Sequence, residues 1–374
     1  MPQPGTRSDR YLRLAGTLLA GSLGGAVFAW LNTPLPWMLG ALFVTTCLAL
    51  AGARLELPQP LRRIMITVLG VMLGSAFHAD IFDHVVRWFA TLAGMVAYIV
   101  ASAGLAMWFF QRIGRLDPVT SFFAAAPGGL SEMAVLGPMM GGDERQITLV
   151  HATRIVMVMM IIPPAFRIFG GYVPPANLGA TAGLLDIAPF DLGMLALAAV
   201  GGFVIARALR FPAYQMTGPM IASAAIHMAE ITTARPPFEL IAAAQVIIGC
   251  GAGVRFAGVS FRELTRPVAL SVVSTSGLLI SATLFALLMS ALTGIDFRAI
   301  ILAYGPGGFA EMNLIALSLG IEVPFVAVHH VGRIFLVVML ASWLSQLLWK
   351  RRLQTPSGGG NPARSRKSPP EAGN

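Results

Sequence analysis

The sequence predicts an all-α membrane protein, a polytopic helical bundle built from two homologous halves. Apolar residues make up 56% of the 374 residues and charged residues only 11%, with a mean hydropathy of +0.74. A soluble domain carries about 25% charged residues. Several apolar stretches reach the roughly 20 residues that a helix needs to cross a bilayer. Most of the chain also repeats itself, which indicates two equivalent halves.

The apolar stretches form two sets of five expected spans, each with one shorter, broken element. The first set is 14–31, 35–52, 61–79, 88–111 and 147–169, with the broken element at 118–140. The second set is 192–206, 213–231, 238–256, 267–292 and 324–349, with the broken element at 297–320. The expected organisation is a cytoplasmic N-terminus (1–13), repeat 1 (14–170), a linker (171–189), repeat 2 (190–350) and a disordered basic tail (351–374).

The first span has an alternative interpretation as a secretion signal. Arg7, Arg10 and Arg13 precede the apolar run from Leu14 to Leu31, which is the order found in a signal peptide. The repeat supplies a counterpart for this run in the second half. An uncleaved first span is therefore favoured.

The repeat is carried by a duplicated motif. Ala126–Met133 (APGGLSEM) reappears as Gly305–Met312 (GPGGFAEM), 179 residues later. The same offset relates three further pairs, which are His151 and His330, Arg154 and Arg333, and Asp117 and Asp296. A shared register of Pro, Gly, Glu, His and Arg is not a consequence of apolar composition. The chain is therefore interpreted as an internal duplication.

The broken elements either cross the membrane or turn back as re-entrant hairpins, and the arginines distinguish the two topologies. Cytoplasmic loops carry an excess of Arg and Lys. With two hairpins, six central arginines are cytoplasmic (Arg145, Arg207, Arg210, Arg255, Arg262 and Arg266) and three are outside (Arg167, Arg235 and Arg298). With two crossings these sets exchange sides and the halves are parallel. The larger number of cytoplasmic arginines favours hairpins. Each half then crosses the membrane five times, so the second half is inverted relative to the first. Both topologies put both termini in the cytoplasm.

The Pro-Gly-Gly breaks form the predicted binding site. A break exposes backbone groups that lipid cannot satisfy, so it must line a cavity or be buried in protein. Asp117 and Pro118 fit the N-cap and first position of the preceding half-helix. The half-helix that follows directs its positive end toward an anion. The predicted substrate-binding residues are Pro127, Gly128, Gly129, Pro306, Gly307 and Gly308, together with Arg154 and Arg333.

Two glutamates, Glu132 and Glu311, lie one turn beyond the breaks. An ionisable side chain at membrane depth is a functional hypothesis by default, so both are expected to bind a coupling proton or cation. His151 and His330 are assigned to the same role, because each lies three residues before an arginine and shares its helix face. The structural alternative is a buried Glu–Arg ion pair that locks each hairpin to its neighbour.

Other classes of function find little support. Cys47 and Cys250 lie in apolar runs and make no disulfide framework, and no metal site, cofactor or enzymatic activity is expected. The 26 Lys and Arg against 17 Asp and Glu fall in short clusters between apolar stretches and in the tail, which fits topology signals rather than nucleic-acid binding. The expected partners are the lipid bilayer and a small solute, with a homo-oligomer left open.

The duplicated P-G-G-x-x-E-M followed by H-x-x-R resembles the AbrB membrane-protein family of bacteria, an AbrB duplication, over residues 11–350. The resemblance implies the inner membrane. Members are labelled AbrB family transcriptional regulators or putative ammonia monooxygenases, and are distinct from the small DNA-binding AbrB regulators. An oxygenase needs copper or iron ligands, whereas each half offers one histidine beside an arginine. No soluble DNA-binding module is present, so an effect on gene expression would be indirect.

The sequence therefore favours a secondary transporter or exporter of a small polar or anionic solute. The alternative is a membrane regulator or sensor that binds the same ligand without moving it. A monooxygenase is the third interpretation.

Overall fold

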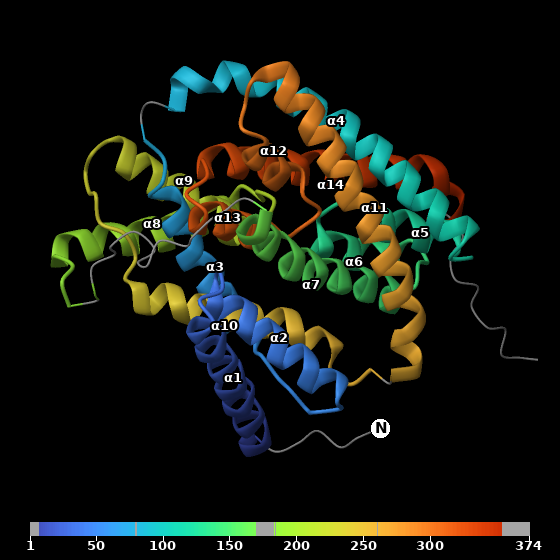
Figure 1. Cartoon of the computed structure of the whole chain (residues 1–374), viewed down its shortest axis with the longest axis horizontal. Coiled ribbons are helices and arrows are strands. Elements are labelled where there is room, and N and C mark those ends of the chain that lie inside the picture. Colours follow the sequence, from blue (N-terminus) through green and yellow to red (C-terminus); the bar gives the residue numbers. More distant parts are fainter. Residues whose placement is uncertain (1–6, 79–80, 170–182, 184, 260, 354–374) are drawn as a thin grey trace, which may run out of the picture.

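The computed structural model describes residues 7–78, 81–169, 183, 185–259 and 261–353. Within these ranges every regular element is a helix, which confirms the all-α class (Figure 1). The outermost part of the expected N-terminus, most of the expected linker and nearly all of the expected tail lie outside the described residues, so the structure does not test those assignments.

The helices fall close to the expected ranges. Residues 7–169 form α1 (Arg7–Trp30), α2 (Pro36–Leu50), α3 (Gln59–Gly74), α4 (Ile81–Arg112), α5 (Pro118–Ala125), α6 (Leu130–Met139) and α7 (Glu144–Phe169). Residues 189–353 form α8 (Pro189–Ala208), α9 (Tyr214–Met228), α10 (Phe238–Gly253), the short 3₁₀ helix η1 (Val254–Phe256), α11 (Phe261–Thr293), α12 (Phe297–Tyr304), α13 (Phe309–Ser318) and α14 (Val323–Leu353).

Seven of the described helices are long and apolar enough to cross a membrane: α1, α4, α7, α8, α10 with η1, α11 and α14. Three expected spans are shorter, because α2, α3 and α9 have only 15, 16 and 15 residues. At 1.5 Å per residue these reach about 22–24 Å, less than the roughly 30 Å of a hydrocarbon core. Several apolar spans are thus present, while five crossings per half stays a prediction.

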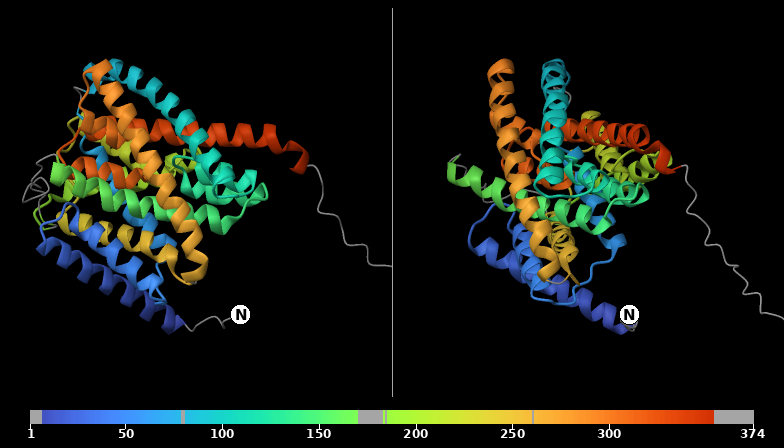
Figure 2. Two further views of the ribbon diagram at one scale, coloured as in Figure 1. Left: turned by 45° about the vertical axis from the view of Figure 1, so that its right-hand side comes forward. Right: turned by 90° about the vertical axis from the view of Figure 1, so that its right-hand side faces the viewer.

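The helices pack as two groups. The first, called the paired bundle, contains α1–α3 and α8–α10, in which α2 packs against α1 and α10, and α9 packs against α8 and α3. The second, called the hairpin group, contains α4–α7 and α11–α14. There α5 and α6 pack against α7, and α12 and α13 against α14, while α4 and α11 run side by side (Figure 2). Between the groups, α3 touches α13 and α7 touches α2 and α10.

Glycines allow the closest helix contacts in the paired bundle. A Cβ added to Gly24 on α1 would lie 2.9 Å from the carbonyl carbon of Gly40 on α2. A Cβ on Gly202 of α8 would lie 2.6 Å from the carbonyl carbon of Gly218 on α9. Small residues at such crossings let helix backbones approach each other in membranes. Gly24, Gly40, Gly202 and Gly218 therefore serve close helix packing.

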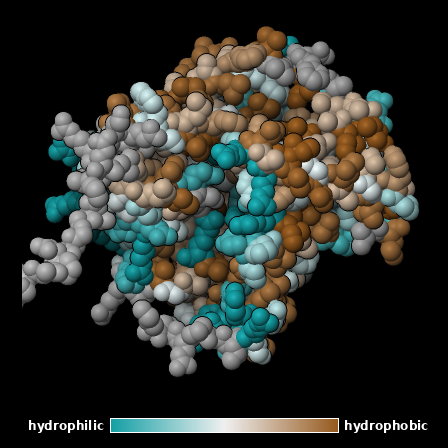
Figure 3. Space-filling view, turned by 180° about the vertical axis from the view of Figure 1, so that it is seen from behind, coloured by the Kyte–Doolittle hydropathy of each residue, from teal (hydrophilic) through white to brown (hydrophobic). Residues whose placement is uncertain are grey.

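The outer surface is largely apolar. Large hydrophobic side chains are exposed on α1, α4, α8 and α11, including Leu23, Phe89, Val204 and Leu284. In the space-filling view, hydrophobic residues cover much of the face, and hydrophilic residues gather in a central band (Figure 3). Exposed apolar area of this extent fits a protein whose surface lies in a membrane.

Candidate functional site

Each break separates two short helices that fold back on each other. Thr120, near the start of α5, accepts a hydrogen bond through Oγ1 from the backbone N–H of Asp143, just beyond α6, over 2.8 Å. A Cβ added to Gly137 near the end of α6 would lie 3.4 Å from the Cβ of Phe123 on α5. The outer ends of α5 and α6 are therefore adjacent, and the break at Ala126–Gly129 is the tip of a hairpin.

The start of each hairpin is fixed by an aspartate. Asp117 Oδ1 accepts from the backbone N–H groups of Val119 and Thr120 at 3.0 and 2.9 Å, and Pro118 occupies the first turn. The predicted N-cap is thus confirmed. Asp296 plays the same role for α12, accepting from the N–H of Arg298 at 2.8 Å.

Replacing Asp117 by alanine is expected to lower the free energy of unfolding by about 1 kcal/mol, because two N–H groups lose their acceptor. Asp117→Asn is the control, since asparagine caps helices nearly as well as aspartate. The measurement is thermal denaturation in detergent micelles. Equal stability of the alanine and asparagine variants would show that the cap contributes nothing.

The first hairpin is held at its break by two side chains of α7. Arg154 donates from Nη1 to the carbonyl of Ala126 over 2.6 Å and from Nη2 to that of Ala124 over 2.8 Å. His151 Nε2 lies 2.9 Å from the carbonyl oxygen of Phe123. These carbonyls lie at the end of α5, where no intrahelical donor remains. The cation also lies at the negative end of the helix dipole, where it is stabilised.

The second hairpin repeats this arrangement with α14. Arg333 donates to the carbonyls of Gly305 and Gly307 over 2.5 and 2.7 Å, and His330 Nε2 lies 2.9 Å from the carbonyl of Leu302. Arg333 Nη2 also lies 2.9 Å from His330 Nδ1. Because a guanidinium only donates, Nδ1 must accept, which leaves the proton on Nε2 and makes His330 neutral. This geometry favours a helix-terminating role for His330 over the predicted coupling role.

The Glu–Arg ion pairs of the structural alternative do not form. Among the described residues, neither Glu132 nor Glu311 lies within 4.0 Å of an arginine nitrogen, whereas ion pairs occur elsewhere, as in Arg10–Glu56, Arg145–Glu263 and Arg298–Asp296. Arg154 and Arg333 instead use both terminal nitrogens for backbone carbonyls, which the sequence pattern did not anticipate. Open carbonyls at a helix break are strong acceptors that no side-chain spacing reveals.

The two glutamates lie at the starts of α6 and α13, three residues after the N-cap glycines Gly129 and Gly308. Their carboxylates fold back toward these glycines. Glu132 Oε2 lies 3.5 Å from where a Cβ of Gly129 would be, and the Glu311 carboxyl carbon lies 2.8 Å from the equivalent point at Gly308. The positive end of each helix stabilises a carboxylate there. Glu311 is only 7% exposed.

A pocket of about 280 Å³ lies where the two breaks meet. It is called the central pocket here. Its wall combines residues of α3, of η1 and of 211–216 at the start of α9 with residues of the hairpin group. Six of the predicted site residues line it, namely Gly129, Glu132, Gly307, Gly308, Glu311 and Arg333. The structure thus brings both glutamates to one cavity, although they lie 179 residues apart.

The remaining predicted site residues lie elsewhere. Arg154, His151 and His330 are buried behind the breaks, with exposed fractions of 1%, 2% and 0%. Pro127 lines a separate apolar groove between α4 and α14. Gly128 and Pro306 lie at the breaks but do not line the central pocket. Gly128 packs against the Arg333 guanidinium, and Pro306 is buried.

Two arginines in the wall were not among the predicted site residues, and one of them, Arg255, was counted only as a topology signal. Arg62 at the start of α3 and Arg255 in η1 both line the central pocket. At the offset of 179 residues their counterparts are Ile241 and Ala76, so a search restricted to repeated residues passes over them. The only signal was a charge inside an apolar run, which Arg255 provides.

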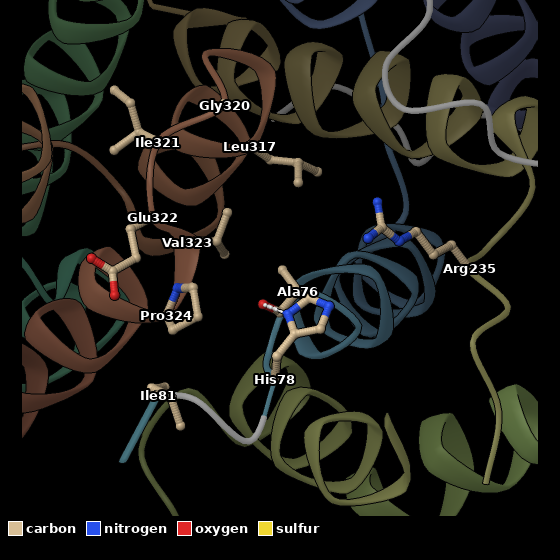
Figure 4. A pocket seen from close by; sticks show the side chains of 10 residues that line it. All are labelled: Ala76, His78, Ile81, Arg235, Leu317, Gly320, Ile321, Glu322, Val323 and Pro324. Atoms are coloured by element: carbon tan, nitrogen blue, oxygen red, sulfur yellow. Dashed lines mark hydrogen bonds between the residues drawn. The ribbon is translucent and has the colours of Figure 1, made fainter. Parts of the chain in front are cut away.

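A second, larger pocket of about 430 Å³ lies at the opposite end of α13. It is bounded by the turn from α13 to α14 and by the segment joining α3 to α4. His78 and Arg235 extend into it, and His78 Nδ1 lies 3.1 Å from the carbonyl oxygen of Ala76 (Figure 4). None of the predicted site residues lines this pocket. Among the described residues, no group of three His, Cys, Asp or Glu side chains could hold a metal ion.

Comparison with known proteins identifies the family of this chain. The family model described as "Transition state regulatory protein AbrB" matches residues 37–349. The chain belongs to the AbrB family. It is 29% identical over 371 residues to "Uncharacterized protein YhjN" of Bacillus subtilis (strain 168), covering 91% of this chain and 94% of that protein. It is 23% identical over 333 residues to "Putative regulator AbrB" of Escherichia coli (strain K12), covering 86% and 92%. The AbrB match thus extends over nearly all the helices described above.

Proposed function

We propose that this AbrB-family protein is a secondary transporter or exporter of a small polar or anionic solute in the bacterial inner membrane, with both termini cytoplasmic. The central pocket carries the proposal. It lies between two helix groups, at the tips of two broken helices, and contains a glutamate from each. Substrate and coupling-ion sites of secondary transporters are formed in this way by discontinuous helices near the membrane midplane.

The paired geometry supports an inverted repeat. α1–α2 and α8–α9 cross at equivalent glycines, and α2 and α9 each follow a residue with left-handed backbone, Leu35 (φ 48°) and Ala213 (φ 50°). The outer ends of α5 and α6 lie together, since Thr120 Oγ1 accepts from the backbone N–H of Asp143. Re-entrant hairpins therefore fit better than crossings, and with five crossings per half they invert the second half.

In this mechanism the glutamates link solute binding to a proton or cation. Each carboxylate lies at a positive helix end inside the central pocket, where protonation or cation binding changes the net charge of the pocket. Because the pocket lies between the paired bundle and the hairpin group, movement of one group against the other would open it to each side in turn.

Gln substitution of both glutamates tests the proposal. The Glu132→Gln, Glu311→Gln double variant, reconstituted in liposomes, is expected to lose pH-gradient-driven accumulation of radiolabelled small carboxylates and amino acids that the wild type accumulates. Glu144→Gln, at the exposed start of α7, is the control and should behave as wild type. Undiminished gradient-driven accumulation by the double variant would remove the coupling role.

A membrane regulator or sensor is the second candidate, favoured by the name "Putative regulator AbrB" of the Escherichia coli relative. It would use the same pocket and bind the ligand without moving it. Saturable binding to the purified protein with no flux in liposomes, with or without a pH gradient, would favour the sensor.

A further inference from the structure

The ionisable residues of the central pocket are unbalanced in charge. The wall contains three arginines, Arg62, Arg255 and Arg333, and two glutamates, Glu132 and Glu311. With both carboxylates ionised, one positive charge is in excess. Among the described residues, none of these five forms an ion pair within 4.0 Å. A cation in a low-dielectric wall is costly without a counter-charge, so the pocket favours an anion.

The three arginines are not equivalent. Arg333 is 1% exposed, and its terminal nitrogens already donate to the carbonyls of Gly305 and Gly307, so it adds a positive charge to the wall but no free terminal donor. Its buried Nε has no hydrogen-bond acceptor. The buried Nε of Arg62 also lacks one. Arg255 lines the same pocket as Arg62 and Glu311. Arg62 and Arg255 therefore present two like charges and unused donors to one space.

Most of the remaining wall is apolar and the space is small. Ile66, Ile155, Phe211, Phe309 and Ile334 line it, beside the polar residues Tyr214 and Gln215. A volume of about 280 Å³ equals that of roughly nine liquid waters at ~30 Å³ each. It lies just below the roughly 300–1,000 Å³ that ligand pockets usually have. An inorganic anion would leave this apolar wall without a contact, whereas a small organic anion would fill it.

We propose that Arg62 and Arg255 bind the carboxylate of a small organic monoanion whose apolar part lies against the isoleucines and phenylalanines of the central pocket. Guanidinium groups match carboxylates with paired, charge-assisted hydrogen bonds. A monoanion is favoured over a dianion because Glu132 and Glu311 would repel a second negative charge. The inference deepens the proposed function, but it concerns binding and holds for a sensor as well as for a transporter.

Ligand-dependent thermal stability of the purified full chain in detergent tests this assignment. The probes are propionate, butyrate and benzoate, each beside its neutral amide, with inorganic phosphate and succinate for comparison. We expect at least one monocarboxylate to raise the melting temperature of wild type at concentrations where its amide, phosphate and succinate do not. In Arg62→Gln and Arg255→Gln the apparent affinity should fall by about tenfold or more, because a charge-assisted bond is lost.

Two control sets keep the test decisive. Arg63→Gln removes a charge from the next, exposed residue of α3 and should bind like wild type. Arg62→Lys and Arg255→Lys keep the charge and should retain part of the affinity, which separates a binding role from a folding defect in the Gln variants.

Several outcomes would overturn the assignment. They are equal affinity in the Gln variants and wild type, stabilisation by the amides as strong as by the carboxylates, a preference for phosphate or succinate, and no shift of wild type by any monocarboxylate. Arginine-dependent binding without flux in liposomes would instead uphold this inference while refuting transport.

Discussion

Replacing Arg333 by methionine is expected to destabilise the protein more than any other single change at the breaks. The variant leaves the carbonyls of Gly305 and Gly307 buried without a donor. Each unsatisfied buried acceptor costs about 1–3 kcal/mol, so the loss is about 2–6 kcal/mol. Methionine keeps much of the side-chain volume, so cavity formation adds little. Thermal denaturation in detergent should show a large fall in melting temperature, or no folded protein.

Arg298→Met is the matched control. Arg298 belongs to the same hairpin, but its side chain is 55% exposed and pairs with Asp296 at the surface, where ion pairs contribute little. The melting temperature of Arg333→Lys should lie between those of Arg333→Met and wild type, because an ammonium lacks the planar fork that reaches two carbonyls. Equal melting temperatures of Arg333→Met, Arg298→Met and wild type would show that Arg333 does not stabilise the protein through these carbonyls.

Replacing Gly24 by leucine is expected to separate α1 from α2. The new Cβ would lie 2.7 Å from Cγ2 of Val44 and 2.9 Å from the carbonyl carbon of Gly40. A backbone cannot rotate away as a side chain can, so the helices must move apart and lose contact along their length. Overpacking alone costs about 1–3 kcal/mol, and the displaced helix adds to it.

The control is Gly16→Leu on the same helix, where an added Cβ meets nothing within 4 Å. Both substitutions exchange the same residue types in α1, so helix propensity and apolar content change alike. A lower melting temperature in detergent is expected for Gly24→Leu alone. Equal melting of the two variants would contradict a tight α1–α2 crossing.

Much of the architecture could be predicted because it depends on local pattern. Apolar run length predicts the helices, and Asp117-Pro118 predicts where the first hairpin begins, since an N-cap and the residue after it are neighbours in the chain. Length was predicted less well. The expected spans 35–52 and 61–79 form helices of 15 and 16 residues, which end earlier than expected, at Leu50 and Gly74.

The acceptors of the arginines could not be predicted in the same way. His151 and Arg154 were correctly placed on one face, but the groups they bind are backbone carbonyls of another helix. Every residue has such a carbonyl, and only the fold decides which ones lack a donor.

The sequence by itself determined the class of protein, the duplicated Pro-Gly-Gly breaks and the two glutamates beyond them, because each of these is written in composition or in short-range order. Tertiary structure decided that both glutamates share one pocket, and that the wall between them includes Arg62 and Arg255. These arginines lie on α3 and η1, outside the repeated motif, and reach the breaks only because the paired bundle packs against the hairpin group. Proximity between segments far apart in the chain depends on how helices pack, which no local pattern encodes.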